Sequence, residues 1–141
     1  NETNQAAVLT ATLSVTAFTF RSASYKPTAT TLGYLKWAVR SSAASSATTS
    51  STDTCATGAV ASGSFNGLTI PNSGTSASGL PKTLGSFTIN VPANTAEKTD
   101  NYYLYIWLSG SYTHNNVGDV NSDPMQGISF TTQWSGTINN S

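Results

Sequence analysis

In the stretch AVLTATLSVTA, residues 7–17, apolar side chains occur at every second position, with Thr or Ser between them from residue 10 onward, and the stretch carries no charge and no glycine. A period of two is typical of a β-strand that buries one face. The residues on the apolar face are Ala7, Leu9, Ala11, Leu13, Val15 and Ala17. The pattern predicts a strand, but it leaves open whether that strand completes the sheet of its own chain or the sheet of a neighbour.

Other β-type runs follow along the chain, and helix signals are nearly absent. These runs cover residues 31–40, 58–70, 84–91, 101–110 and 125–138. Turn-forming residues separate them, and no helical segment alternates with them. The sequence therefore predicts an all-β fold, a single antiparallel jelly-roll-like sandwich.

The run NYYLYIWLSG, residues 101–110, is the most apolar one and is bulky on both faces. A strand of this kind is expected in the middle of a packed structure. Trp107 belongs to this run, and Trp134 is in phase with Ile128 and Phe130 in the last run. We therefore expect both tryptophans in the core.

Composition narrows the class of protein. The chain has 141 residues, of which only 9% are charged, and six basic residues balance six acidic ones. A nucleic-acid or anionic-lipid partner would need a basic patch, so neither is expected. Low charge with abundant Ser and Thr is more frequent in secreted and surface proteins, which predicts an extracellular location. The sequence has no apolar run long enough for a membrane span. Because the first residue is Asn and not Met, we expect a mature chain after signal cleavage, with a truncation as the alternative.

Catalytic chemistry is not expected. Cys55 and His114 are the single cysteine and the single histidine, which are too few for a zinc cluster and exclude an intrachain disulfide. No G-x-S-x-G motif is present, and the six acidic residues lie mostly in predicted loops. The prediction is a protein that is not an enzyme and holds no cofactor.

The segment DVNSD, residues 119–123, offers a candidate calcium site. Asp119, Asn121 and Asp123 present oxygens at positions 1, 3 and 5 of a calcium loop. Pro124 and Phe130, however, stand where that loop requires glycine and glutamate. A plain turn with capping Asx side chains is the favoured alternative.

Two sequons, at Asn1 and Asn139, are possible N-glycosylation sites of a surface protein. The alternative is chance, because a chain rich in Ser and Thr generates sequons freely.

The carboxyl-terminal stretch YYLYIWLSGSYTHNNVGDVNSDPMQGISFTTQWSGTI, residues 102–138, resembles the end of the TasA/camelysin family. The matching elements are an aromatic LYIW strand at residues 104–107, a polar loop at 119–123 and a last strand at 126–136 that contains TQW-x-G. The resemblance covers about a quarter of the chain. Camelysin is classed as a metallopeptidase, but this chain lacks a histidine pair, so that activity is not carried over.

The resemblance implies a jelly-roll-like domain that is exported and assembled into fibres, as in related archaeal bundling pilins. In such fibres the amino-terminal strand of one subunit completes the sheet of the next. We therefore expect a donor segment at residues 1–20, a β-sandwich domain at 21–141, and copies of the chain as head-to-tail partners, with lateral bundling between filaments as a further possibility.

Two other functions remain as alternatives. One is an adhesive or carbohydrate-binding module that does not polymerise, with Trp37, Trp107 and Trp134 as stacking platforms. The other, ranked last, is a secreted hydrolase.

Overall fold

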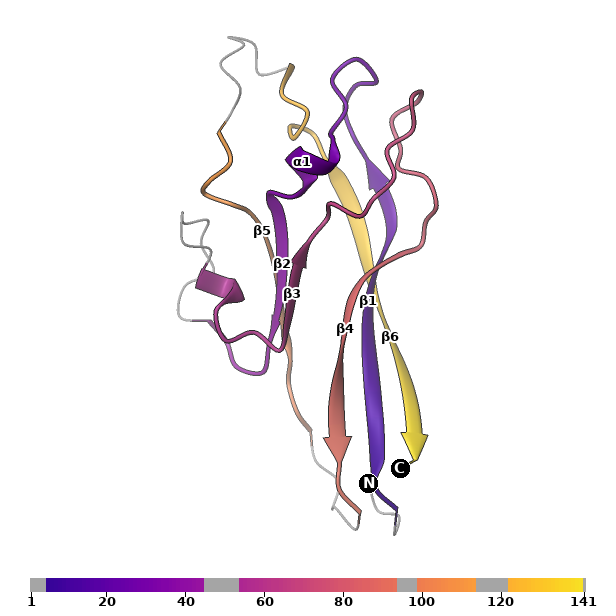
Figure 1. Ribbon diagram of the computed structural model, residues 1–141, viewed down its shortest axis with the longest axis vertical. Coiled ribbons are helices and arrows are strands. Elements are labelled where there is room, and N and C mark those ends of the chain that lie inside the picture. Colours follow the sequence, from indigo (N-terminus) through magenta and orange to yellow (C-terminus); the bar gives the residue numbers. More distant parts are fainter. Residues whose placement is uncertain (1–4, 45–53, 94–98, 114–121, 141) are drawn as a thin grey trace.

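The strand predicted at residues 7–17 lies inside the β-sandwich of its own chain (Figure 1). The computed structural model describes residues 5–44, 54–93, 99–113 and 122–140. Within them the chain is nearly all β and forms two antiparallel sheets of three strands each. The predicted all-β sandwich is confirmed.

The elements follow one another as β1 (Ala7–Thr19), α1 (Ala29–Leu32), β2 (Leu35–Arg40), the 3₁₀ turn η1 (Thr54–Ala56), β3 (Ala61–Ser64), β4 (Lys82–Val91), β5 (Tyr103–Leu108) and β6 (Ser129–Asn140). Sheet A has the strand order β4-β1-β6, and sheet B has the order β3-β2-β5. Among the described helices, none has the length and apolar character that a membrane crossing requires.

β1 is the central strand of sheet A and pairs along both of its edges. Its residues 7–15 lie opposite β4, and its residues 7–19 lie opposite β6, antiparallel in both cases. β4 and β6 are joined in this sheet only through β1. In the single chain the amino-terminal strand is therefore part of the sandwich, and the expected division into a donor segment (residues 1–20) and a β-sandwich domain (21–141) stays a prediction.

Alternation indicates that one face of a strand is buried, but it says nothing about which chain supplies the neighbouring strands. A donor strand and a central strand of the same chain need the same pattern. Donation of β1 to a second copy is not tested by a single chain and stays a prediction.

The alternation of β1 does not run to its end. The register against β6 shifts between Val15 and Ala17, as at a β-bulge, and this shift changes which residues point inward. Leu13 and Val15 are buried, whereas Ala17 is exposed and Phe18 enters the core. The prediction that Ala17 shares the buried face is wrong, because a strict period of two does not survive a bulge.

The apolar run at residues 101–110 supplies an edge strand and not a middle one. β5 pairs with β2 alone among the described strands. Ile106 packs against the core between the sheets, while Trp107 packs on the outer face with Ala38 and Cys55, the latter in η1. The 3₁₀ turn η1 thus covers the outer face of β5, where the sequence pattern predicts a neighbouring layer.

Two strands, β2 and β3, are shorter than the β-type runs at residues 31–40 and 58–70 that contain them. The first run begins inside the helix α1. Residues 29–32 form α1 because Thr28 caps it: the Thr31 N–H donates to Thr28 Oγ1 (3.2 Å), and the Thr28 N–H donates to Thr31 Oγ1 (2.8 Å). Of the run at 58–70, only β3 is a strand.

The two sheets approach closely around Trp37, whose side chain is only 2% exposed. A Cβ placed on Gly85 of β4 would lie 2.6 Å from Trp37 Cη2, and one on Gly63 of β3 would lie 3.0 Å from Trp37 Nε1. Both distances are shorter than van der Waals contact allows. The indole therefore occupies the space that side chains at these two positions would fill.

We expect Gly85→Ala to lower the free energy of unfolding by about 1–3 kcal/mol relative to Gly67→Ala, because the buried indole cannot move away from the added methyl group. Gly67 is the matched control, since a Cβ there meets only Lys82 Cε at an ordinary 3.7 Å. Both changes remove similar backbone freedom from the unfolded chain. Urea unfolding of the two variants measures the difference, and equal stabilities would contradict the packing described.

Candidate functional site

The two sheets differ in length, and this difference leaves part of sheet A uncovered. β1 and β6 have 13 and 12 residues, whereas β2 and β5 have six each. Figure 1 shows β1, β4 and β6 running on past the lower ends of β2 and β3, toward the two chain ends. In the part of the chain that the structure describes, sheet B therefore covers one half of the inner face of sheet A and leaves the other half open.

An apolar groove of about 410 Å³ lies on this uncovered half. Its lining comes from β1, β4, β6 and the start of β5, and consists of Leu9, Ala11, Phe87, Ile89, Tyr102, Leu104, Trp134, Ser135 and Gly136. The Phe87 ring contacts Tyr102 with centroids 5.0 Å apart and meets Trp134 edge-on at 5.9 Å. Such tilted and edge-on pairs are favourable aromatic geometries. The groove is thus a preformed apolar surface with an aromatic wall.

Trp134 and Ile138 of β6 remain largely open to solvent, at 41% and 70% exposure. Trp134 lies on the inner face, opposite Leu13, as its phase predicts. The prediction that Trp134 is a core residue is nevertheless wrong, because sheet B ends before it can cover this part of β6. The matching prediction for Trp107 is confirmed, since that side chain is 6% exposed.

The predicted donor face of β1 is divided between two environments. Leu13 and Val15 lie in the closed core. Leu9 and Ala11 line the open groove, and Ala7 next to them is half-buried. β1 therefore both fills the slot between β4 and β6 and supplies part of the groove floor.

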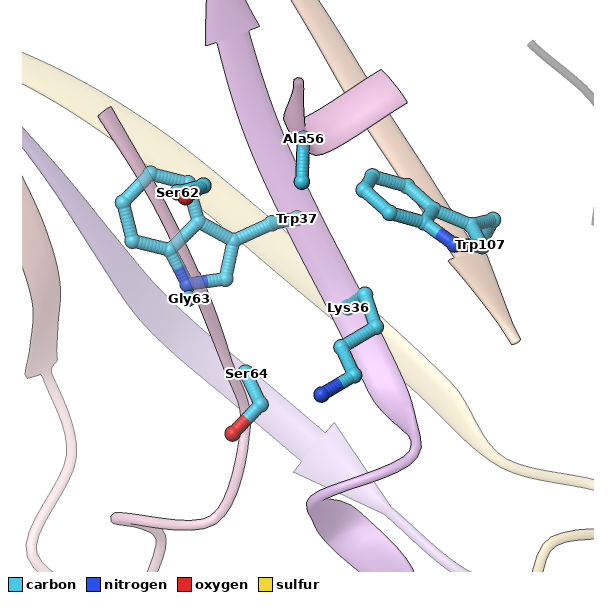
Figure 2. A pocket seen from close by; sticks show the side chains of 7 residues that line it. All are labelled: Lys36, Trp37, Ala56, Ser62, Gly63, Ser64 and Trp107. Atoms are coloured by element: carbon cyan, nitrogen blue, oxygen red, sulfur yellow. The ribbon is translucent and has the colours of Figure 1, made fainter. Parts of the chain in front are cut away.

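A second hollow, of about 240 Å³, lies over sheet B beside η1. Lys36 lies between Ser64 and Trp107 in the register of the sheet, and Figure 2 shows these side chains around the hollow with Ala56 of η1. The described residues that line it offer an ammonium group and hydroxyls, with no carboxylate or imidazole.

The calcium candidates are only partly within the described residues. Asp119 and Asn121 lie outside them. The Asp123 carboxylate accepts hydrogen bonds from the Tyr112 hydroxyl and, at 2.9 Å, from the Met125 N–H. It therefore braces a turn, as the alternative interpretation predicts. Among the described residues no group of three or more metal-ligating side chains is assembled.

The remaining candidate residues lie only partly within the described residues. Cys55 is buried beneath the outer face of sheet B, where the Arg40 guanidinium donates to its carbonyl oxygen at 3.3 Å. His114 and Asn1 lie outside the described residues. Asn139 is an exposed residue of β6.

The groove was not predicted from the sequence. The run lengths give no usable signal, because the run at residues 58–70, which supplies β3 of sheet B, is longer than the run at 7–17. Strand pairing must be known before these lengths can be compared, and the sequence alone does not give it.

No protein-family model matches the chain, and neither curated proteins nor solved structures give a match. The resemblance to the TasA/camelysin family therefore stands on residues 102–138 alone.

The Tyr112–Asp123 contact makes stability depend on pH in the alkaline range. Burial, the hydrogen bond to Asp123 and the charge of that carboxylate raise the pKa of Tyr112 above its ordinary value of 10.0. Above pH 10 the unfolded chain loses this proton while the folded chain keeps it, so the folded state loses stability as the pH rises. We expect the stability advantage of wild type over Tyr112→Phe to shrink above pH 10 in urea unfolding. An advantage that is constant from pH 7 to pH 11 would contradict this assignment.

Proposed function

We propose that the protein is the structural subunit of an extracellular filament in which β1 of one copy occupies sheet A of the next. The single observation that carries this proposal is the position of β1: it precedes every other described strand, yet it fills the central slot between β4 and β6. A slot with two strand edges and an apolar floor accepts a strand from any copy, because backbone hydrogen bonds and alternate side chains provide the recognition.

Exchange of β1 conserves its contacts. A second copy's β1 pairs with β4 and β6 in the same register as the chain's own β1, so the enthalpy of pairing is similar in the closed and exchanged forms. Residues 20–28, which connect β1 to α1, are the natural hinge. The choice between the two forms then depends mainly on chain concentration and on the conformation of this hinge.

Exchange of β1 joins different surfaces of the two copies, and this determines the shape of the assembly. Each copy donates β1 at one position and accepts β1 at another, so the contact is head-to-tail. A head-to-tail contact that does not close into a ring propagates as a filament. The closed single chain is the self-complemented form of the same subunit.

Pairing on both edges makes the closed form slow to open. β1 must break its hydrogen bonds with two strands and withdraw Leu13 and Val15, which are 1% and 0% exposed, from the core. Exchange is therefore expected while the chain folds, before its own β1 docks. Once formed, either form persists because unfolding is slow.

Composition and resemblance support a location outside the cell. The low content of charged residues and the many Ser and Thr residues fit a surface or matrix protein. The TasA-like carboxyl end adds the expectation of a fibre-forming, exported protein. Together they favour a filament over a soluble intracellular role.

The adhesive or carbohydrate-binding function is the second candidate, and exposed Trp134 is the observation that favours it. Trp37 and Trp107 are buried and cannot act as stacking platforms. A sugar also needs hydrogen-bonding groups beside the aromatic ring, whereas the groove around Trp134 is mainly apolar. These contacts fit an apolar protein segment better than a sugar.

Refolding at different concentrations tests the proposal. Chains refolded at low micromolar concentration should give mainly the closed monomer, and chains refolded at high concentration should give head-to-tail oligomers and filaments. Both products should then survive dilution, because β1 leaves its slot slowly. Size-exclusion chromatography and negative-stain microscopy measure the distribution.

An intrachain lock provides the control. Thr10 of β1 lies directly opposite Thr88 of β4, so Thr10→Cys with Thr88→Cys, in a Cys55→Ala background, can be oxidised in the dilute monomer. The locked protein should form no filaments when it is concentrated in mild denaturant, and reduction should restore filament assembly. Filaments that form equally well from the locked protein would contradict exchange of β1.

A further inference from the structure

β6 presents a long, open edge of sheet A. One of its edges pairs with β1 over most of its length, and no described strand pairs with the other. Its sequence, SFTTQWSGTINN, contains no charge and no proline. Edge strands are usually protected from other chains by such residues, by short length or by a bulge at the edge. β6 has no charged residue and no proline, and at 12 residues it is not short, so these three protections are missing.

Solvent also reaches both faces of β6 in its second half. Every residue from 133 to 140 is exposed, including Trp134 and Ile138 on the groove face. Unpaired backbone groups and exposed apolar side chains thus occur on the same segment. A neighbouring strand would pair with the backbone groups and cover the apolar side chains.

We propose that β6 pairs antiparallel with β6 of a second copy, about a two-fold axis at Gly136. This pairing joins two sheets A into one continuous sheet across the dimer. It is isologous, because each copy contributes the same residues.

The self-complementarity of β6 determines this register. With the axis at Gly136, Trp134 lies opposite the partner's Ile138, and Ile138 lies opposite the partner's Trp134. These are the two exposed large apolar side chains of the strand, and an aromatic–β-branched pair of this kind is a favourable cross-strand contact. Gly136 at the axis has no side chain to obstruct the approach, and on the opposite face Ser135 lies across from the partner's Thr137.

Electrostatics do not oppose the contact. β6 is uncharged and the chain has a formal net charge of zero, so two copies approach without repulsion between like charges. The contact between two single strands is smaller than a standard interface, which buries roughly 1,200–2,000 Å². We therefore expect a weak dimer that exchanges rapidly and is populated at high concentration.

The other edge of sheet A is less suited to this pairing. β4 begins with the charged Lys82, and its inward side chains Phe87 and Ile89 are already half-buried in the groove. β6 is thus the edge on which a second strand covers the most exposed apolar surface.

This inference does not rest on exchange of β1. The dimer forms from closed chains and leaves β1 in place. In a filament, the same contact would join neighbouring filaments side by side.

Matched lysine substitutions on the two edges of sheet A test the proposal. Thr137 of β6 and Thr88 of β4 both lie opposite Thr10 on the same face of the sheet, and both are exposed. Sedimentation velocity of closed wild-type monomer should show a rapidly reversible monomer–dimer equilibrium. Thr137→Lys should weaken it about tenfold, because the two lysines then lie diagonally across the axis on the same face of the joined sheet and repel each other, and Thr88→Lys should leave it unchanged.

Disulfide trapping tests the register. In a Cys55→Ala background, a mixture of the Ser135→Cys and Thr137→Cys proteins should form covalent dimers at a higher yield than either protein alone. Preferential trapping of Ser135→Cys with itself would place the axis elsewhere and overturn the proposed register.

Three results would overturn the pairing itself: a chain that stays monomeric at millimolar concentration, a dimer that Thr137→Lys does not weaken, or a dimer that Thr88→Lys weakens equally. Rapid re-equilibration on dilution separates this dimer from β1-exchanged oligomers, which are expected to persist. Each proposal can therefore fail without the other.

Discussion

Pairing of β1 with β4 on one edge and with β6 on the other is the interaction on which the rest of this structure depends. Among the described strands only β1 connects the outer strands of sheet A, and two of its side chains, Leu13 and Val15, lie in the core. The first strand must meet the last strand of the described chain before the sheet is complete. Contacts at such long sequence separation form slowly, which gives another copy time to compete for the slot.

The groove and the open edge of β6 have one common origin. Both arise because the long strands of sheet A extend beyond the short strands of sheet B, so that Trp134 and Ile138 have the phase of core residues without a layer to cover them. Large apolar residues left exposed together in this way are typical of interaction surfaces. The excess length of sheet A therefore accounts for the exposed apolar surface on which the lateral pairing is proposed.

Sequence patterns predicted the fold class and the existence of most strands, because alternation over residues such as 7–15 depends only on burial of one face. They could not place Ala17 or Trp134, since a bulge and a missing opposite layer are decided by tertiary pairing. The edge position of β5 was missed for a similar reason: η1, a loop element, buries Trp107. For the candidate site, the sequence identified β1 as the strand of interest but gave no sign of the slot, the groove or the free edge of β6.

Interchain cross-linking tests the central claim, that β1 of one copy occupies the slot of another, most directly. Thr10 of β1 lies opposite Thr137 of β6, so one preparation carries Thr10→Cys and a second carries Thr137→Cys, both with Cys55→Ala. The doubly substituted chain, oxidised as a dilute monomer, shows whether the geometry permits the bond. After the two single variants are refolded together at high concentration, the account predicts disulfides between different chains within the filaments. Filaments that form without any such bond, while the doubly substituted monomer oxidises readily, would contradict it.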